Sequence, residues 1–245
     1  MNSKKIKGVI TDISLGKTAT LAGSAYLIIF ILGIFDNFFI FKSLIVPGNA
    51  SLTANNVIAN EQLFRWGTSI WLFVLILDVI IAWALYIFLK PVNKMFSLLA
   101  GWFRIVYTAI FGITQILMFI ALEILSNTDY LSVFTKDQLN AFSMMFIKAH
   151  DTGFLISLVF FGVHCLLLGY LVIKSDYIPH ILGFLLIAAS FGYIIDSFAH
   201  FLISNYVDYE MIFLIIVAVP AIIAELSFPL WMLIKGSKIE TAATP

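Results

Sequence analysis

The sequence predicts an all-α fold, a polytopic membrane protein built as a bundle of six transmembrane helices with both termini in the cytoplasm. Hydrophobic residues make up 62% of the chain and charged residues only 11%, with a mean hydropathy of +1.04. Soluble domains carry about 25% charged residues. Six apolar runs are long enough to cross a bilayer, and lysine and arginine gather on one side of them. We therefore expect one membrane-embedded domain over residues 1–245, with lipid as its solvent.

The six runs are read as helices because of their length and their pattern. A spanning helix needs about 20 predominantly apolar residues. Within the bilayer, backbone groups must find partners inside the protein, so a spanning segment is a helix or part of a closed barrel. The runs lack the alternation at every second residue that a barrel strand would show. The predicted spans are 18–41, 66–89, 95–125, 141–173, 179–203 and 211–234.

The connections between the spans differ on the two sides of the membrane. Two short ones, "KPVNK" and "KSDYIP", predict tight antiparallel hairpins of spans two and three and of spans four and five. The first long connection places Ala54, Val57 and Ile58 at helical spacing, which predicts an amphipathic segment on the outer surface. In the second, Thr135 and the glutamine three residues later match a capping box. The fourth helix is therefore expected to begin near Lys136 and to project beyond the membrane.

The orientation follows from the basic residues, which concentrate on the cytoplasmic side of membrane proteins. With both termini inside, the outer segments hold three of them, at Lys42, Arg65 and Lys136. The inner segments hold nine, at Lys4, Lys5, Lys7, Lys17, Lys90, Lys94, Lys174, Lys235 and Lys238. This asymmetry predicts cytoplasmic termini. The 14 basic and 14 acidic side chains cancel, so no overall field attracts nucleic acid, and none is expected as a partner.

Four ionisable residues are predicted to form a polar layer near the middle of the membrane. Counted from the inner lysines at about 1.5 Å per residue, they reach similar depths on different helices: Asp78, Arg104, His164 and Glu225. Such residues are costly in lipid and by default face the bundle interior. Asp78 and Arg104 lie on the two arms of one hairpin, so we expect an ion pair. A pair of this kind serves either a functional path or the register of the helices.

A second polar layer is predicted near the outer surface, as a ligand or ion site. Its candidates lie on spans one, four and five: Asp36, His150, Asp151, Asp196, Ser197 and His200. Asp196 and His200 share one helical face and could bind a divalent metal or relay a proton. The candidate metal ligands are His150, Asp196 and His200. An isolated Asp and His pair is more often an interhelical hydrogen bond than a metal site, so a bound metal is the alternative.

Several stretches carry a resemblance to a known family. "FFGVHCLLLGYLVIKSDYIPHILG" and "GYIIDSFAHFL", together with "LKPVNK", "ANEQLFR" and "AELSFPLWMLIKG", resemble a bacterial membrane family catalogued as domain of unknown function 4386. The resemblance covers nearly the whole chain after the first fifteen residues, and the region from His164 to His200 is its most specific part. It implies a six-helix protein of a bacterial inner membrane, and it implies no activity.

Three functions stay open from the sequence. The first is a small transporter, or a ligand-binding or ion-binding membrane protein, with a polar cavity that opens outward. The second is an intramembrane metal-dependent hydrolase, and the third is a non-catalytic structural membrane protein. The sequence contains no nucleotide-binding glycine loop, nucleophile elbow or HExxH motif. The expected partners are the lipid bilayer and a small ligand or ion.

Overall fold

The computed structural model describes residues 14–126 and 129–239. Within them every regular element is helical. The α-helices are α1 (Leu15–Phe35), α2 (Lys42–Leu44), α3 (Ala50–Ala59), α4 (Glu61–Leu89), α5 (Lys94–Leu125), α6 (Lys136–Lys174), α7 (His180–Leu202) and α8 (Glu210–Ile234). The short elements are the π-helix η1 (Asp36–Phe41) and the 3-10 turns η2 (Asp129–Leu131), η3 (Tyr206–Tyr209) and η4 (Gly236–Lys238).

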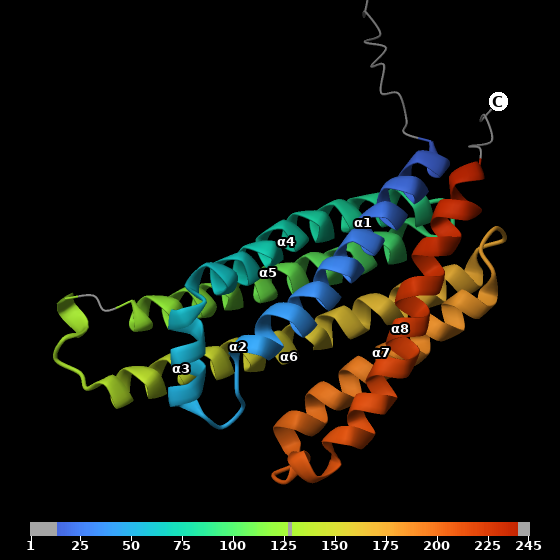
Figure 1. Cartoon of the computed structure of the whole chain (residues 1–245). Helices are drawn as coiled ribbons and strands as arrows, with labels where there is room; N and C mark the ends of the chain where they lie inside the picture. The colour runs from blue at the N-terminus through green and yellow to red at the C-terminus, as the bar shows by residue number, and fades with distance from the viewer. Residues whose placement is uncertain (1–13, 127–128, 240–245) are drawn as a thin grey trace, which may run out of the picture.

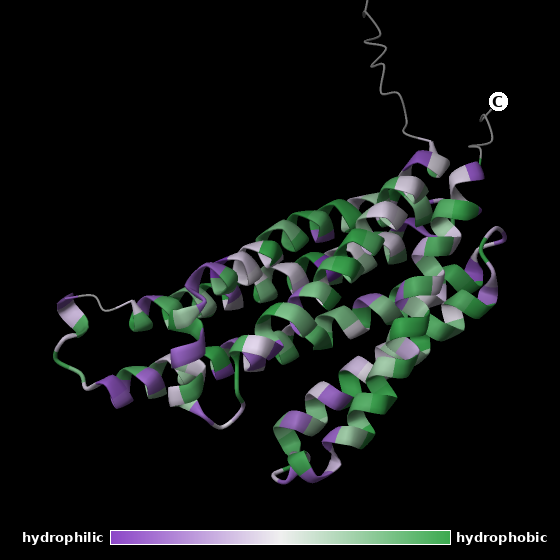
Figure 2. Ribbon diagram, in the orientation of Figure 1, coloured by the Kyte–Doolittle hydropathy of each residue, from purple (hydrophilic) through white to green (hydrophobic). Residues whose placement is uncertain are grey.

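The prediction of a six-helix membrane protein is confirmed. Six helical segments of the described chain, 23 to 39 residues long, have the length and apolar composition needed to cross a membrane. Figure 2 shows hydrophobic residues along the helices and hydrophilic residues mainly toward their ends. Helix α6, with 39 residues, is about 58 Å long at 1.5 Å per residue. The hydrocarbon core of a bilayer measures about 30 Å, so α6 exceeds the length needed to cross it.

Several helices begin earlier than their apolar runs. Helix α4 begins at Glu61 rather than at residue 66, and α6 begins at Lys136 rather than at residue 141. The start of α6 is fixed by the predicted capping box, in which Thr135 and Gln138 bond reciprocally. Polar residues extend these helices because caps and backbone hydrogen bonds, not hydrophobicity, decide where a helix begins.

The two ends of the bundle differ in shape (Figure 1). Helix α1 begins and α8 ends at the same end, which we call the inner end. At the opposite, outer end, α3 lies across the bundle and packs on α6. The segment is helical, as its spacing predicted; Ala54 and Val57 of α3 are buried against the bundle, and Ile58 is 49% exposed. The outer ends of α7 and α8 lie apart from those of α4, α5 and α6.

Helices α6 and α7 approach each other closely through glycine. A Cβ atom added at Gly169 of α6 would lie 2.7 Å from the carbonyl oxygen of Gly183 on α7. In lipid, where apolar side chains gain nothing by leaving the solvent, small residues let helix backbones pack by van der Waals contact. This contact fixes where the α7–α8 hairpin crosses α6.

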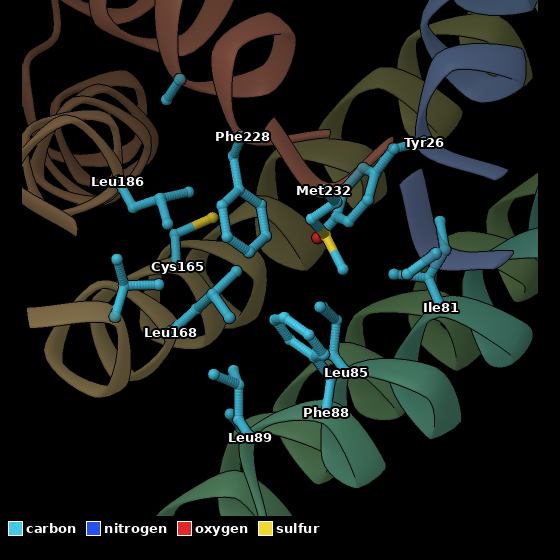
Figure 3. Close-up of a cluster of buried hydrophobic side chains, with 14 of the residues drawn as sticks. Tyr26, Ile81, Leu85, Phe88, Leu89, Cys165, Leu168, Leu186, Phe228 and Met232 are labelled. Carbon is cyan, nitrogen blue, oxygen red and sulfur yellow. The ribbon is translucent and has the colours of Figure 1, made fainter. Parts of the chain in front are cut away.

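The larger of two apolar clusters among the described residues lies mainly in the inner half of the bundle. Figure 3 shows side chains of five helices converging there: Tyr26, Ile81, Leu85, Phe88, Leu89, Cys165, Leu168, Leu186, Phe228 and Met232. The loop before α7 closes this core, because the Tyr177 hydroxyl donates to the carbonyl oxygen of Phe88 at 2.8 Å. Burial raises the pKa of Tyr177 to about 12, so the hydroxyl keeps the proton that it donates.

Candidate functional site

Arg104, in the inner half of α5, is the centre of a buried hydrogen-bond network. Its side chain is 2% exposed. One terminal nitrogen, Nη2, donates to Asp78 Oδ1 on α4 and completes the predicted ion pair. The other, Nη1, donates to the Tyr26 hydroxyl on α1 at 2.5 Å and lies 3.3 Å from His164 Nε2 on α6. One guanidinium therefore joins four helices.

The hydrogen bonds of His164 define which ring nitrogen carries the proton. Nδ1 lies 2.8 Å from the carbonyl oxygen of Ala100 on α5. A carbonyl can only accept, so Nδ1 must donate and carry the hydrogen. In the neutral ring Nε2 is then an acceptor, and it receives a hydrogen bond from Arg104. His164 thus serves as an oriented acceptor for the guanidinium.

Two aromatic rings complete the surroundings of the guanidinium. Arg104 Cζ lies 4.6 Å from the centre of the Tyr26 ring and 5.5 Å from that of Phe161. Both distances fall within the range of cation–π attraction. Nε of Arg104 is buried and has no hydrogen-bond partner among the described residues. Both terminal nitrogens of the guanidinium are therefore held, while its Nε–H has no acceptor among the described residues.

Glu225 of α8 lies in a second polar group beside this network. The Tyr193 hydroxyl of α7 donates to Glu225 Oε1. The Phe161 ring separates the two groups, with its centre 5.3 Å from that of Tyr193 and 5.8 Å from that of His164. Glu225 lies between Pro220 and Pro229 in α8. Proline has no N–H to donate four residues back, so Pro229 leaves the backbone carbonyl of Glu225 without its helical partner.

Each of the six spans thus contributes one residue to what we call the polar layer: Tyr26, Asp78, Arg104, His164, Tyr193 and Glu225. The four predicted midplane residues all belong to it, but Glu225 bonds to Tyr193 instead of to the charged pair. Sequence reasoning missed Tyr26. The depth count could have found it, because Tyr26 comes nine residues after Lys17 as Arg104 comes ten after Lys94.

Asp36, the first predicted outer residue, is fully buried at the start of the π-helix η1. One of its carboxylate oxygens accepts a hydrogen bond from Trp71 Nε1 on α4 at 2.6 Å. The other oxygen has no hydrogen-bond partner among the described residues. Single π-helical turns occur frequently at functional sites. Neither the π-turn nor the Trp71 partner was visible in the sequence.

His150 and Asp151 of α6 lie on the far side of an aromatic ring from Asp36. His150 Nε2 lies 3.1 Å from Gln115 Nε2, and its Nδ1 lies 3.1 Å from Asp151 Oδ1. The Phe111 ring centre lies 6.0 Å from that of His150 and 5.1 Å from that of Trp71. Trp71 and His150 therefore both pack against Phe111, which stands between the groups.

Asp196 and His200 lie in the last two turns of α7 and share Tyr206 of the following loop. The Tyr206 hydroxyl donates to Asp196 at 2.5 Å, and the ring centres of His200 and Tyr206 are 4.0 Å apart. Ser197 is fully buried, and its hydroxyl has no hydrogen-bond partner in the described part of the chain. In the part of the chain that the structure describes, no hydrogen bond or ion pair joins Asp196 or His200 to Asp36, His150 or Asp151.

A metal site needs three or more ligands that meet. No three His, Cys, Asp or Glu side chains within residues 14–126 and 129–239 lie close enough to hold a metal ion. Among the described residues, none of the candidate ligands His150, Asp196 and His200 therefore belongs to a group of three such side chains. A pocket of about 870 Å³ opens instead at the inner end, beside Lys17 and Lys238, and one of about 310 Å³ at the outer end, beside Arg65 and Glu123.

All six residues of the polar layer lie in the part of the chain that matches a sequence family. Residues 21–236 match the family model described as "Domain of unknown function (DUF4386)". An "Uncharacterized protein" of Archaeoglobus fulgidus is 36% identical over 173 residues, which are 70% of this chain and 85% of that relative. This relative is archaeal, so a bacterial origin stays a prediction. No solved structure matches the chain. The chain belongs to the family of proteins that carry domain of unknown function 4386.

Proposed function

We propose that the protein is a transporter of a small solute or ion and that the polar layer is its binding or coupling site. The observation that carries this proposal is the composition of the layer, to which all six spans contribute. Ionisable residues are costly within a membrane and typically mark a substrate or proton path. In secondary transporters such sites lie near the bilayer midplane, where the moving helices meet.

The charged groups of the polar layer suit the binding and release of a solute or proton. Arg104 supplies one fixed positive charge, and Asp78 and Glu225 supply two carboxyl groups on different helices. Only Asp78 pairs directly with the guanidinium, while Glu225 is held by a neutral hydroxyl and lies in a helix interrupted by two prolines. A solute or proton bound at Glu225 would change the charge balance around Arg104. That change would couple binding to movement of α8.

A structural role is the second candidate, and it rests on a separate observation. Arg104 already has Asp78, Tyr26 and His164 as partners, and this part of the layer can hold four helices together without any substrate. The two candidates differ at Glu225, which a purely structural network around Arg104 does not need. The metal-dependent hydrolase has no supporting observation among the described residues and is not proposed.

The test compares Glu225→Gln with Glu210→Gln, an exposed glutamate at the start of the same helix. Purified proteins in liposomes are adsorbed on a solid-supported membrane, and charge movement is recorded for steps of pH, cations, small carboxylates and amino acids. We expect at least one step to drive a current that Glu210→Gln keeps and Glu225→Gln loses, with equal melting temperatures. Equal responses of both variants and the parent to every step would favour the structural role.

We also propose that both termini are cytoplasmic and that the protein lies in the cell membrane, with the lipid bilayer and a small solute or ion as its partners. Nine inner against three outer basic residues support this orientation. Reporter enzymes fused after Lys94 and after Asn205 should be active inside and outside the cell, respectively. The reverse pattern would overturn the orientation but not the proposed site.

A further inference from the structure

Helix α7 carries two buried hydroxyl groups that no group of residues 14–126 and 129–239 satisfies. Ser190 and Ser197 are both 0% exposed, and neither Oγ atom has a hydrogen-bond partner among the described residues. Most other buried serines in the described part of the chain differ in this respect. Ser143, for example, donates to the carbonyl oxygen of Ala121 on the neighbouring helix. Buried polar groups of native proteins are satisfied by protein or by ordered water, so the two hydroxyls indicate positions that can bind water.

The two hydroxyls line up with the Glu225 pair. Residues three and four apart lie on the same face of a helix, so Ser190, Tyr193 and Ser197 follow one another along one stripe. Tyr193, between the two serines, donates to Glu225. The stripe from Ser190 to Ser197 covers about 10 Å along the helix axis. Ser197 lies on the outer side of Tyr193, and Ser190 lies on the inner side.

The stripe continues with polar residues to the outer end of α7. The opposite face of the helix is apolar. Asp196 is partly exposed and accepts from Tyr206, while His200 is exposed and packs on the same ring. Large apolar side chains cover the rest of the helix, with Ile195 48% and Phe198 49% exposed. Lipid therefore covers one face of α7, and hydrogen-bonding groups run along the other from the outer end to Glu225.

We infer that this stripe is a water-binding path, by which water from the outer end reaches Glu225 along Ser197 and Tyr193 and ends at Ser190. The inference deepens the proposed function and rests on it for the role of the path. That role is to supply Glu225, the proposed coupling residue, with water and protons from the outer end. The path itself is independent of transport. A protein that moves no solute can contain it, and a transporter that loads Glu225 from the inner end would lack it.

The test uses the single cysteine of the chain. Cys165 is buried, so Cys165→Ala gives a background in which new cysteines report their own surroundings. Ser190→Cys and Ser197→Cys change one atom each, and Ile195→Cys places a thiol on the lipid-exposed face of the same helix. Each variant, in liposomes and with its melting temperature checked, is treated with a small membrane-impermeant methanethiosulfonate that reacts with thiolates.

Thiolates form only where water can stabilise them, so Ser197→Cys and Ser190→Cys should react at least about tenfold faster than Ile195→Cys. Ser197→Cys should be the faster of the two because it lies nearer the outer end. Reaction of either serine variant at the Ile195→Cys rate would overturn the path.

A second measurement needs no substitution. Hydroxyl radicals generated by X-rays from bound water should oxidise Tyr193 in the native protein and spare Phe88, which is buried in the apolar core. An unlabelled Tyr193 in well-folded native protein would equally overturn the path. Neither measurement depends on transport, so a failed transport assay beside a reactive Ser197→Cys would remove the proposed function and leave the water path.

Discussion

The two halves of the polar layer are built differently. Around Arg104, the carboxylate of Asp78 and the ring of His164 are almost completely buried, and each has a defined partner. Around Glu225, the carboxyl group accepts from one neutral hydroxyl, that of Tyr193. A network in which every member pairs with another favours one arrangement of its helices. Among the described residues, Glu225 and Tyr193 form a single pair, and the serine hydroxyls on either side of Tyr193 have no partner. Under the proposed function, the Arg104 network therefore holds the helices together, and Glu225 lies on the helix that moves.

The packing of the helices divides them differently and sets α8 apart together with α1. In the most apolar stretches of α4, α5, α6 and α7, 44% to 50% of the residues are buried inside the protein. In the spans that contain α1 and α8 this share is 17%. Helix α8 is also interrupted by Pro220 and Pro229, each of which removes a backbone hydrogen bond. Fewer contacts and fewer backbone bonds make α8 the easier helix to displace.

The largest expected effect is loss of the buried ion pair. Asp78→Asn and Arg104→Gln should each lower the free energy of unfolding by about 3–5 kcal/mol, because each strands the other charge. The double variant should lose less than the sum of the two. Unfolding in mixed detergent micelles measures all three. Additive losses would show that the two side chains act independently.

Two tyrosines, one in each half, give the next comparison. Tyr26→Phe removes a hydrogen bond to the Arg104 guanidinium and should cost about 1.5–3 kcal/mol, as for bonds to charged groups. Tyr193→Phe removes a bond to a carboxyl group that water can reach if the inferred path exists, and should cost less than about 1 kcal/mol. The same unfolding assay compares them. A larger loss for Tyr193→Phe would reverse the assignment of the two halves.

The contact between the halves can be broken at Gly169. A methyl group there meets the backbone oxygen of Gly183 at 2.7 Å, so Gly169→Ala should destabilise by about 1–3 kcal/mol through overpacking. Gly112→Ala is the matched control, because its methyl would meet only a flexible end of the Leu75 side chain at 3.3 Å. The control should keep or raise the melting temperature. Equal melting temperatures for both variants would mean that α6 and α7 can move apart at Gly169 without a loss of stability.

The smallest effect compares two buried serines. Ser143→Ala removes a hydrogen bond to the Ala121 carbonyl and should cost about 0.5–1.5 kcal/mol. Ser197→Ala removes a hydroxyl that has no partner among the described residues and should change stability by no more than about 0.5 kcal/mol. Melting temperatures of the two variants and the parent make the comparison. A loss at Ser197 as large as that at Ser143 would indicate a protein partner for this hydroxyl.

The sequence by itself determined the six spans, because lipid as a solvent requires about 20 apolar residues for each crossing. It also determined the start of α6, since the bonds between Thr135 and Gln138 are local. The ion pair of Asp78 and Arg104 was predictable because the short hairpin between α4 and α5 fixes their relative depth, which a count of residues measures.

Only the tertiary structure decided which of the residues at similar depth contact one another. Depth does not specify the rotation or the crossing of a helix, so Tyr26 and Glu225 could be placed in a layer but not given partners. The same holds for the outer residues. Asp36 and His200 were expected at one depth. The close contact of α6 and α7 at Gly169 sets the course of the α7–α8 hairpin. The outer end of this hairpin, which carries His200, therefore lies apart from the other helices. Such crossings depend on side chains distant in the sequence, and no local pattern encodes them.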